Sequence, residues 1–545
     1  MCFNEIGLSY LFLVSKKEGK FMKKKELIII LGSLLVVVLS ISMAYFSTTI
    51  NSKNSNVSTS SAELKIVFTS GTGTISGSEI EPGWSSGVNT FTVKNQSNDA
   101  YKYNIVIKDL INTFVTEGYL QYKITSTDGG YNMSDFVDVP KSSINTDITL
   151  GYNINIEKNK THTYNVEFRY LNSETESQNE DMGKELSGTL YIDNNEIKIH
   201  GDYEEGMLGY KLLENNPVRG VRRDFTNIFN STNTETLYTS TESIAGSTHE
   251  TVYYFAGNAK NNWIKFGGYY WRIIRTNHDS SIRLLYVGIS PLATETYIGK
   301  SVFNTENGSP KYVGYMYGNS DNTLDDTRDN TNDSLIKQYI DNWYDGSRTI
   351  VNSSYQKEYT DTSTNKLIDY AKYLSLDAVY CNDRELTSGE SWSAEGVIYA
   401  GYTRIDYAGK GANARPTYDC VNIKDAFSGN NTEAKLKYPI ALMTADEASH
   451  AGAVAYQVNK GGAAYFNTEN MNNYFLLTPV IYKDGDARVW AIDWGSFNGE
   501  LRRLYTHSNI LVVHPVTSLK SCVLWKSGDG SPENPYEIEE TESGC

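Results

Sequence analysis

The sequence predicts a multidomain protein in which an all-β sandwich or jelly roll is followed by an α+β domain. Three observations lead to this fold class. A length of 545 residues is more than one hydrophobic core usually organises. The composition, with 41 Tyr and only 11 Pro, favours strands. Residues 62–195 alternate apolar and polar side chains, whereas residues 251–545 also contain helical periodicity.

The first 46 residues are typical of an export signal. Lys23–Lys25 precede an apolar run, Leu27–Met43, and the small residue Ala44 follows it. A positive start, an apolar middle and a small residue are the order of a signal peptide. Within residues 1–46 we expect a signal peptide cut near Ala44; residues 1–21 either precede a translation start at Met22, which we favour, or form a cytoplasmic lead-in. The alternative is that residues 27–43 are retained as a membrane anchor. Both place the following chain outside the cell.

The region after the expected signal begins with a spacer and continues with strands. Residues 47–61 are polar and have no periodicity, which indicates a spacer. Residues 62–195 then contain short segments with period two, separated by Gly, Asn, Asp or Pro. Strands at this spacing predict a β-sandwich or jelly roll. The segments are LKIVFT, NTFTVKN, YKYNIVI, LQYKITS, YNINIEK, THTYNVEFRY and SGTLYI.

The rest of the chain is expected to be a linker and one α+β domain. Residues 196–250 are interpreted as a linker with a helix at 203–216. In residues 251–545, WIKF, YYWRIIRT and SIRLLY predict a meander of strands. The apolar spacing of residues 333–344 predicts a helix capped by Asn332 or Asp333. Further elements are expected as a helix at 367–374, a strand leading through the cap Thr444 into a helix within 438–455, and short strands at YFLLTP, RVWAID and ILVVHPV.

Charge and cysteine content restrict the kind of partner and the compartment. The net charge of −16 argues against binding to nucleic acid, because an acidic surface repels phosphates. Cys2 precedes the expected signal, so Cys381, Cys420, Cys522 and Cys545 remain in the exported part. Four cysteines allow three pairings. We favour Cys381–Cys420 because both lie within one domain, and we leave the pairing of the other two open.

Several motifs in the first half carry a resemblance to a known family. They are Met43–Phe46 at the end of the signal, an early ELKI strand, the turn Glu81-Pro82-Gly83, and Phe91–Ile105. In this order they resemble the TasA/camelysin family of exported Gram-positive proteins over residues 22–195. The resemblance implies a jelly-roll subunit of an extracellular fibre, and thus self-assembly. Some members of that family are described as metalloproteases.

A zinc-protease site is not supported by the residues themselves. His249-Glu250 lies in HETVY, which lacks the second histidine that would place two imidazoles on one helical face. The resemblance therefore points to the fibre-forming members of the family.

The second half also carries a resemblance. WRIIR, the DNWY helix, Cys381–Arg384 (CNDR), LMTADEA, LLTP, and HPV followed by GDGSPENPY resemble uncharacterised surface proteins of gut Firmicutes over about residues 250–540. His514 stands where arginine would be expected. The layout is similar to C-type-lectin-like folds, including relatives of the formylglycine-generating enzyme, whose cysteines bind copper. That likeness implies a catalytic role for Cys381 as the alternative to a disulfide, although a fold licenses no activity by itself.

Two further groups of residues are candidates for ligand binding. Asp325, Asp326 and Asp329 lie in an acidic run and are candidate calcium ligands; the run lacks the central Gly and terminal Glu of an EF-hand, and a solvated loop is the other interpretation. Calcium is the one cofactor we consider.

The other group is aromatic. Tyr474, Trp490 and Trp494, with the carboxylate of Asp493, are candidates for stacking on a glycan and bonding its hydroxyls. The alternative is that Trp490 is a core residue and Trp494 closes a hairpin.

The sequence therefore favours an exported cell-surface structural or adhesive protein, an adhesin-like molecule whose C-terminal domain binds a glycan or a surface protein. It would be secreted or held at the cell surface, and would meet the membrane only through its N-terminal segment. The alternative is an extracellular enzyme, either a metalloprotease or similar to the formylglycine-generating enzyme. No catalytic residue is identified.

Overall fold

The structure is a computed structural model and is predominantly β, with several sheets. It describes residues 66–70, 74–77, 80–95, 100–116, 118–173, 177–193, 200–225, 237–456, 464–466, 471–493 and 500–545. Within these ranges no helix is both long enough and apolar enough to cross a membrane. The expected signal or anchor (residues 1–46) and the spacer (residues 47–61) lie outside the described residues.

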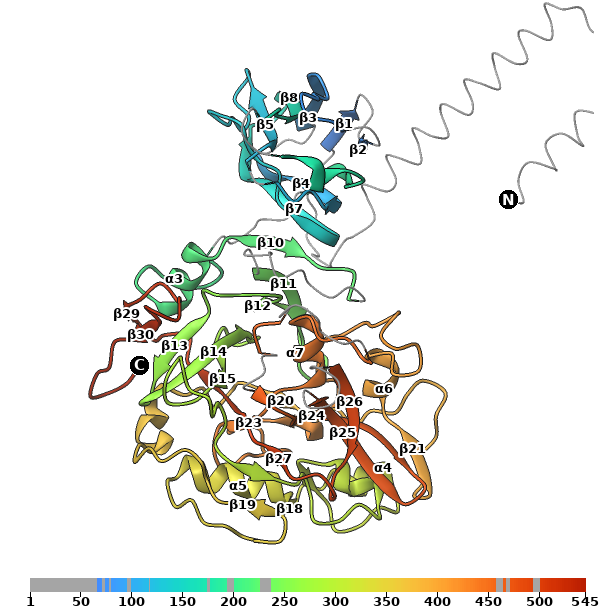
Figure 1. Ribbon diagram of the computed structural model, residues 1–545, viewed down its shortest axis with the longest axis vertical. Coiled ribbons are helices and arrows are strands. Elements are labelled where there is room, and N and C mark those ends of the chain that lie inside the picture. The colour runs from blue at the N-terminus through green and yellow to red at the C-terminus, as the bar shows by residue number, and fades with distance from the viewer. Residues whose placement is uncertain are drawn as a thin grey trace, which may run out of the picture. The chain divides into compact units, whose positions relative to one another are not determined.

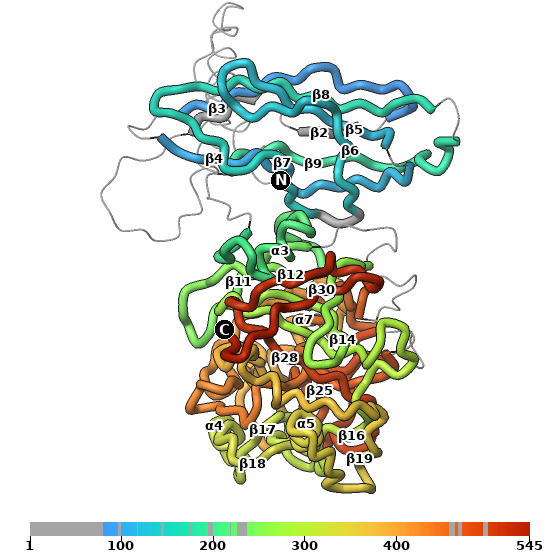
Figure 2. The backbone as a smooth tube through the Cα atoms, turned by 90° about the vertical axis from the view of Figure 1, so that its left-hand side faces the viewer, coloured from blue at the N-terminus to red at the C-terminus, as the bar shows by residue number. Residues whose placement is uncertain are grey.

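Residues 66–193 form two β-sheets, seen as two layers of strands in Figure 2. One sheet has the strand order β1-β3-β8-β5-β6 and the other the order β2-β9-β4-β7. All seven segments with period two become strands or parts of strands. Their bounds are β1 Ile66–Ser70, β2 Thr74–Gly77, β3 Asn89–Asn95, β4 Tyr101–Asn112, β5 Leu120–Ser126, β6 Val137–Asp138, β7 Ser142–Ile156, β8 Thr161–Tyr170 and β9 Leu186–Asp193.

The alternation of side chains explains why these strands pack into layers. In β5 every second residue is buried, from Leu120 to Ser126, so one face of the strand turns to the core. Between the sheets, the hydroxyl of Tyr103 on β4 lies 2.8 Å from Nδ1 of His162 on β8 and also contacts the hydroxyl of Tyr164. These polar groups are partnered inside an otherwise apolar layer, as buried hydroxyls must be.

The C-terminal region is built on two larger sheets (Figure 1). The first has the order β10-β11-β12-β14-β13-β30-β29. In addition, β15 pairs with β14, β28 pairs with β15, and β23 pairs with β28. Its strands are β10 Val218–Val221, β11 Leu237–Glu242, β12 Glu250–Phe255, β13 Trp263–Phe266, β14 Tyr269–Thr276, β15 Ile282–Tyr286, β23 Ile440–Leu442, β28 Pro515–Leu519, β29 Trp525–Ser527 and β30 Tyr536–Ile538. The predicted meander is confirmed as β13, β14 and β15.

The second sheet of this region has the order β19-β16-β27-β24-β25-β26, and β21 pairs with β24. Its strands are β16 Lys300–Ser301, β19 Gln356–Lys357, β21 Gly396–Ile398, β24 Tyr474–Lys483, β25 Asp486–Asp493, β26 Glu500–Tyr505 and β27 Leu511–Val512. Two small ladders complete the strands: β17 Met316–Tyr317 with β18 Asn332–Asp333, and β20 Tyr380–Cys381 with β22 Ala426–Phe427.

Short helices lie between these strands, and their starts follow capping chemistry. The helix at Leu335–Tyr344 (α5) begins one or two residues later than the expected caps Asn332 and Asp333 imply, because Ser334 is the cap and its hydroxyl accepts from the Lys337 amide. Thr444 caps Ala445–His450 (α7) as predicted. The segment 367–373 is a 3₁₀ helix. The remaining α-helices are α3 Leu208–Asn215, α4 Leu324–Thr327 and α6 Ala400–Arg404.

The predicted boundary at residue 250, between a linker at 196–250 and the next domain, is wrong for the described residues. Strand β11 pairs antiparallel with β12, from Leu237 opposite Phe255 to Glu242 opposite Glu250, so the boundary at 250 falls inside one ladder. Tyr203 and Leu208 belong to the hydrophobic core of the C-terminal region. The Thr/Ser-rich composition suggested a linker, but Thr is also a good strand former when it packs on a sheet.

Candidate functional site

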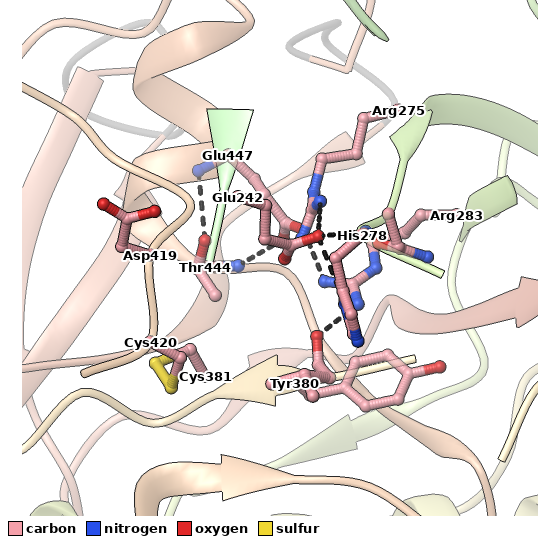
Figure 3. Close-up of polar contacts among 12 residues, drawn as sticks. Glu242, Arg275, His278, Arg283, Tyr380, Cys381, Asp419, Cys420, Thr444 and Glu447 are labelled. Carbon is pink, nitrogen blue, oxygen red and sulfur yellow. Dashed lines mark hydrogen bonds and ion pairs between the residues drawn. A yellow bond between two sulfur atoms is a disulfide. The ribbon is translucent and has the colours of Figure 1, made fainter. Parts of the chain in front are cut away.

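The strongest concentration of buried charge lies where β11, β14, β15 and α7 meet. Arg275 on β14 donates to both carboxylate oxygens of Glu242 at the end of β11, at 2.9 and 3.0 Å. Its Nε donates at 2.9 Å to Glu447 on α7, and Arg283 on β15 donates to the same oxygen at 2.6 Å. Figure 3 shows Glu242 and Glu447 converging on Arg275. All four side chains are at most 3% exposed.

Local structure explains how these side chains meet. Arg275 and Arg283 are register partners on β14 and β15. Glu447 is the third residue of α7 and closes a capping box: its amide donates to the Thr444 hydroxyl at 3.0 Å, and its carboxylate accepts from the Thr444 amide at 2.9 Å. One carboxylate therefore both starts the helix and pairs with two arginines.

A second ion network adjoins the first. Arg404 at the end of α6 contacts both oxygens of Asp446, at 2.7 and 2.9 Å, and reaches Asp383 at 2.7 Å. Bidentate pairs of this kind are the strongest form of arginine–carboxylate contact. Asp446 precedes Glu447 on α7, so neighbouring residues of one helix hold both networks.

A disulfide lies beside these charges (Figure 3). Cys381 on β20 and Cys420 are bonded with an S–S distance of 2.06 Å, which is the pairing that the sequence analysis favoured. Cys522 and Cys545, whose pairing the sequence left open, form a second disulfide. In a disulfide neither Cys381 nor Cys420 is a thiolate that could attack a substrate or bind a metal.

The two networks line a small cavity. It encloses about 20 Å³ of free space, which is room for one water molecule. Tyr418 contributes to the lining, and among the described residues its buried hydroxyl has no hydrogen-bond partner. The other lining residues are Glu242, Arg275, Arg283, Val379, Cys381, Asp383, Arg404, Thr417, Asp419, Thr444 and Asp446.

The charge states of the network follow from burial and pairing. Burial alone raises the pKa of Glu242, but the charge of Arg275 and hydrogen bonds from His278 and Arg275 outweigh it and lower the pKa to about 2. Burial also opposes ionisation of Glu447, yet Arg283 and Arg275 lower the pKa of that carboxyl. Both carboxylates are therefore ionised and fully engaged, which leaves no proton for acid catalysis and little basicity.

The arrangement is suited to structural support. Its arginines are paired with carboxylates, its cavity is small, and its disulfide keeps two sulfurs unreactive. Such a network fixes the positions of β11, β14, β15 and α7 relative to one another. Replacing one partner would leave a buried charge unpaired, which is strongly unfavourable.

Two of the aromatic ligand-binding candidates do not lie on the surface. Tyr474 is 1% exposed and Trp490 is 0% exposed, so neither ring can stack on a sugar, and both are corrected to core residues. Hydrophobic packing within β24 and β25 is the reason, since both strands are almost continuously buried. Asp493 is also buried and accepts from the Asn473 amide group at 2.9 Å. Trp494 lies outside the described residues.

The calcium candidates belong to a capped helix. Asp326 accepts from the Thr323 amide at 3.0 Å in a capping box, and Asp325 lies 3.7 Å from the ammonium of Lys424. Asp329 follows the helix. Within the described ranges no cluster of three or more His, Cys, Asp or Glu side chains is arranged to hold a metal ion. The contacts of these aspartates are therefore local. The acidic composition of the run did not report whether their carboxylates converge on one point.

Sequence reasoning missed the residues of the charge network. Arg275 and Arg283 stand in strands that are otherwise apolar, and such arginines are rarely buried unless they are paired. The sequence therefore contained a signal that these two arginines are buried and paired. The Thr444-x-x-Glu447 spacing was also a visible capping box. No local sequence pattern predicted that β11, β14, β15 and α7 contact one another.

Comparison with known proteins adds no relative: no protein-family model matches the chain, and neither a curated protein nor a solved structure does.

Proposed function

We propose that this chain is an exported cell-surface protein with a structural or adhesive role. The observation that carries the proposal is the pair of disulfides, Cys381–Cys420 and Cys522–Cys545, downstream of the expected export signal. Disulfides form and persist mainly in oxidising surroundings outside the cytoplasm. They therefore support the localisation that the Met22–Phe46 segment suggests.

The N-terminal β region is proposed to be of the jelly-roll type and to assemble with other copies. The first sheet ends in strands β1 and β6 and the second has β2 at one edge, and an open strand edge can accept another strand. The TasA/camelysin resemblance favours the same role. Deleting residues 47–70 is expected to abolish filaments seen by electron microscopy, since the deletion removes the spacer and β1; filaments that persist would contradict the assembly model.

The C-terminal region is proposed to be a C-type-lectin-like domain that binds a ligand. Its support is the layout of early strands, short helices and late strands, together with the resemblance to surface proteins. We favour binding over catalysis because the Glu242 and Glu447 carboxylates are paired with arginines and Cys381 is disulfide-bonded.

The localisation test is surface exposure in intact cells. An epitope-tagged full-length chain expressed in a Gram-positive host is expected to be degraded when external protease is added, while a cytoplasmic marker survives. A matched variant in which Lys23, Lys24 and Lys25 are replaced by Glu is expected to accumulate inside, because the positive start directs export. Full protection of the unaltered chain from protease would overturn the proposal.

A further inference from the structure

A partly exposed cluster of arginines and tyrosines lies on one face of the β25–β26 hairpin. Arg488 pairs with Tyr505 across the ladder and Trp490 pairs with Arg503, so these side chains share a face. The guanidinium carbon of Arg488 lies 4.5 Å from the centre of the Tyr505 ring, and that of Arg503 lies 4.3 Å from the Tyr407 ring. Cations over aromatic faces at these distances are attracted to the ring electrons.

Two more tyrosines extend the cluster. The ring centres of Tyr402 on α6 and Tyr407 are 4.8 Å apart, as are those of Tyr407 and Tyr456. The hydroxyls of Tyr407 and Tyr456 are hydrogen-bonded to each other. We call the set Tyr402, Tyr407, Tyr456, Arg488, Arg503 and Tyr505 the arginine–tyrosine patch.

The fold holds this patch in place. The indole N–H of the buried Trp490 donates to the Gly401 carbonyl at 3.2 Å and so ties α6 to β25. Gly401 is needed there, because a Cβ would lie 2.7 Å from the Thr478 side chain and 2.9 Å from the Pro479 carbonyl. Tyr456 has a φ of +54°, a left-handed backbone that is unfavourable for a bulky residue. Such strain is found preferentially at functional sites.

The exposure of the patch distinguishes it from the aromatic core beneath it. Trp490 is 0% exposed, whereas Tyr505 is 38% exposed and the side chain of Arg488 is 18% exposed. Tyr402, Tyr407, Tyr456 and Arg503 are partly exposed as well. A tyrosine in this setting offers an apolar ring and a polar hydroxyl to the same ligand.

The charge of the patch contrasts with that of the chain. The protein carries a net charge of −16, yet two arginines lie within this small surface and the nearest carboxylate with a recorded ion pair to either is Asp486, 3.8 Å from Arg488. Guanidinium groups match carboxylates in shape and charge. A local basic, aromatic surface on an acidic chain favours a ligand that is anionic but is not a dense polyphosphate.

We propose that the arginine–tyrosine patch binds an acidic saccharide, with sugar faces packed on the tyrosine rings and sugar carboxylates paired with Arg488 and Arg503. This deepens the proposed adhesive function and rests on it. The patch also replaces Tyr474 and Trp490 as the glycan-binding surface, since its rings reach solvent whereas theirs are buried.

The test uses the purified disulfide-bonded chain and an oligosaccharide of galacturonic acid, with its carboxyl-reduced, neutral form as the control ligand. Calorimetry is expected to detect binding of the acidic form, and binding should weaken as salt is raised. Arg503→Gln and Arg488→Gln should each weaken it by about 10-fold or more, because each removes a charge-assisted contact. Tyr402→Ala should also weaken it.

The matched control variant is Lys357→Gln, which removes one positive charge on β19 at the opposite end of the same sheet order and should leave binding unchanged. Each variant must retain the unfolding transition of the unaltered chain. The proposal is overturned if the acidic oligosaccharide does not bind, or if binding is insensitive to Arg488→Gln and Arg503→Gln together. It is also overturned if a polyglutamate peptide binds equally well at the same residues, which would make the ligand an acidic protein segment.

Surface exposure in cells is measured independently. A chain that is exported but does not bind the saccharide refutes only this inference, whereas a chain that stays in the cytoplasm refutes the proposed function.

Discussion

The N-terminal β region and the C-terminal region differ in how they accommodate buried polar side chains. In the former, buried polar groups are held by neutral partners, for example the Tyr103 hydroxyl by that of Tyr164 and the buried Asp181 carboxylate by the Tyr170 hydroxyl at 2.6 Å. In the latter, the core includes Arg275, Arg283 and Glu447, all nearly inaccessible to solvent and paired with one another. Strands of the first region also pair over long sequence separations, but their burial alternates in a pattern that is visible locally, whereas the charge network of the second region has no such local pattern.

The largest expected effect comes from breaking the buried charge network. Glu447→Gln leaves Arg275 and Arg283 short of a buried carboxylate, so the free energy of unfolding of the C-terminal region should fall by about 3–5 kcal/mol. Urea unfolding followed by tryptophan fluorescence measures this. Lys526→Gln is the control, because it breaks an exposed ion pair with Glu537 and should change the value by less than about 0.5 kcal/mol. Equal effects of the two changes would refute the role of the network.

The next largest effects on stability are expected from removing each disulfide in turn. Replacing Cys381 and Cys420 together by Ser opens a loop with a sequence separation of 39 and should cost about 4 kcal/mol in the chain-entropy model. The same change at Cys522 and Cys545, with a separation of 23, should cost about 3 kcal/mol. Neither change should shift the unfolding of the N-terminal β region. Loss of structure in that region would show that the two are not held separately.

Acid should destabilise the C-terminal region. Burial lowers the pKa of His450 to about 3, so the folded state resists protonation that the unfolded chain accepts near its ordinary value of 6.5. The stability is therefore complete above pH 6.5 and is lost as pH falls, by about 2 kcal/mol between pH 7 and pH 5 for this one group. Glu242, with its pKa lowered to about 2, adds a loss below about pH 4.5.

Urea titrations at several pH values measure this dependence. His450→Gln should flatten it between pH 7 and pH 5, and an unchanged slope would contradict the assignment to His450.

The smallest effect tests the neutral core of the N-terminal region. Tyr103→Phe removes the hydroxyl that contacts His162 and Tyr164 and should destabilise this region by about 1–2 kcal/mol. Tyr119→Phe is a suitable control, because the hydroxyl it removes bonds only the partly exposed Ser173 at 2.9 Å among the contacts described. Near-UV circular dichroism during thermal unfolding can follow the region. A cost as large as that of Glu447→Gln would remove the contrast between the two regions.

The sequence predicted the individual helices and strands better than it predicted which of them contact one another. Period two located β3, β5 and β8 to the residue or nearly so, since alternation reports directly which face of a strand is buried. Thr444 was recognised as a cap because capping is a local interaction. The domain boundary at 250 failed because composition does not report strand pairing.

The candidate sites were predicted less well. The sequence left Trp490 open as a ligand-binding ring or a core residue, and the tertiary structure shows that it is a core residue because β25 is covered on that side. Tyr402, Tyr407 and Arg503 are separated by up to about a hundred residues in the sequence, and no spacing rule joins them. Their proximity depends on α6 being tied to β25 through Trp490.

The most direct test of the central claim is the thiol state of the native chain. Protein from the cell surface and from the cytoplasm would be alkylated without reduction, digested and analysed by mass spectrometry. We expect the surface form to dominate, with Cys381 linked to Cys420 and Cys522 linked to Cys545. A chain found in the cytoplasm with all four cysteines alkylated would contradict the account of an exported protein stabilised by disulfides.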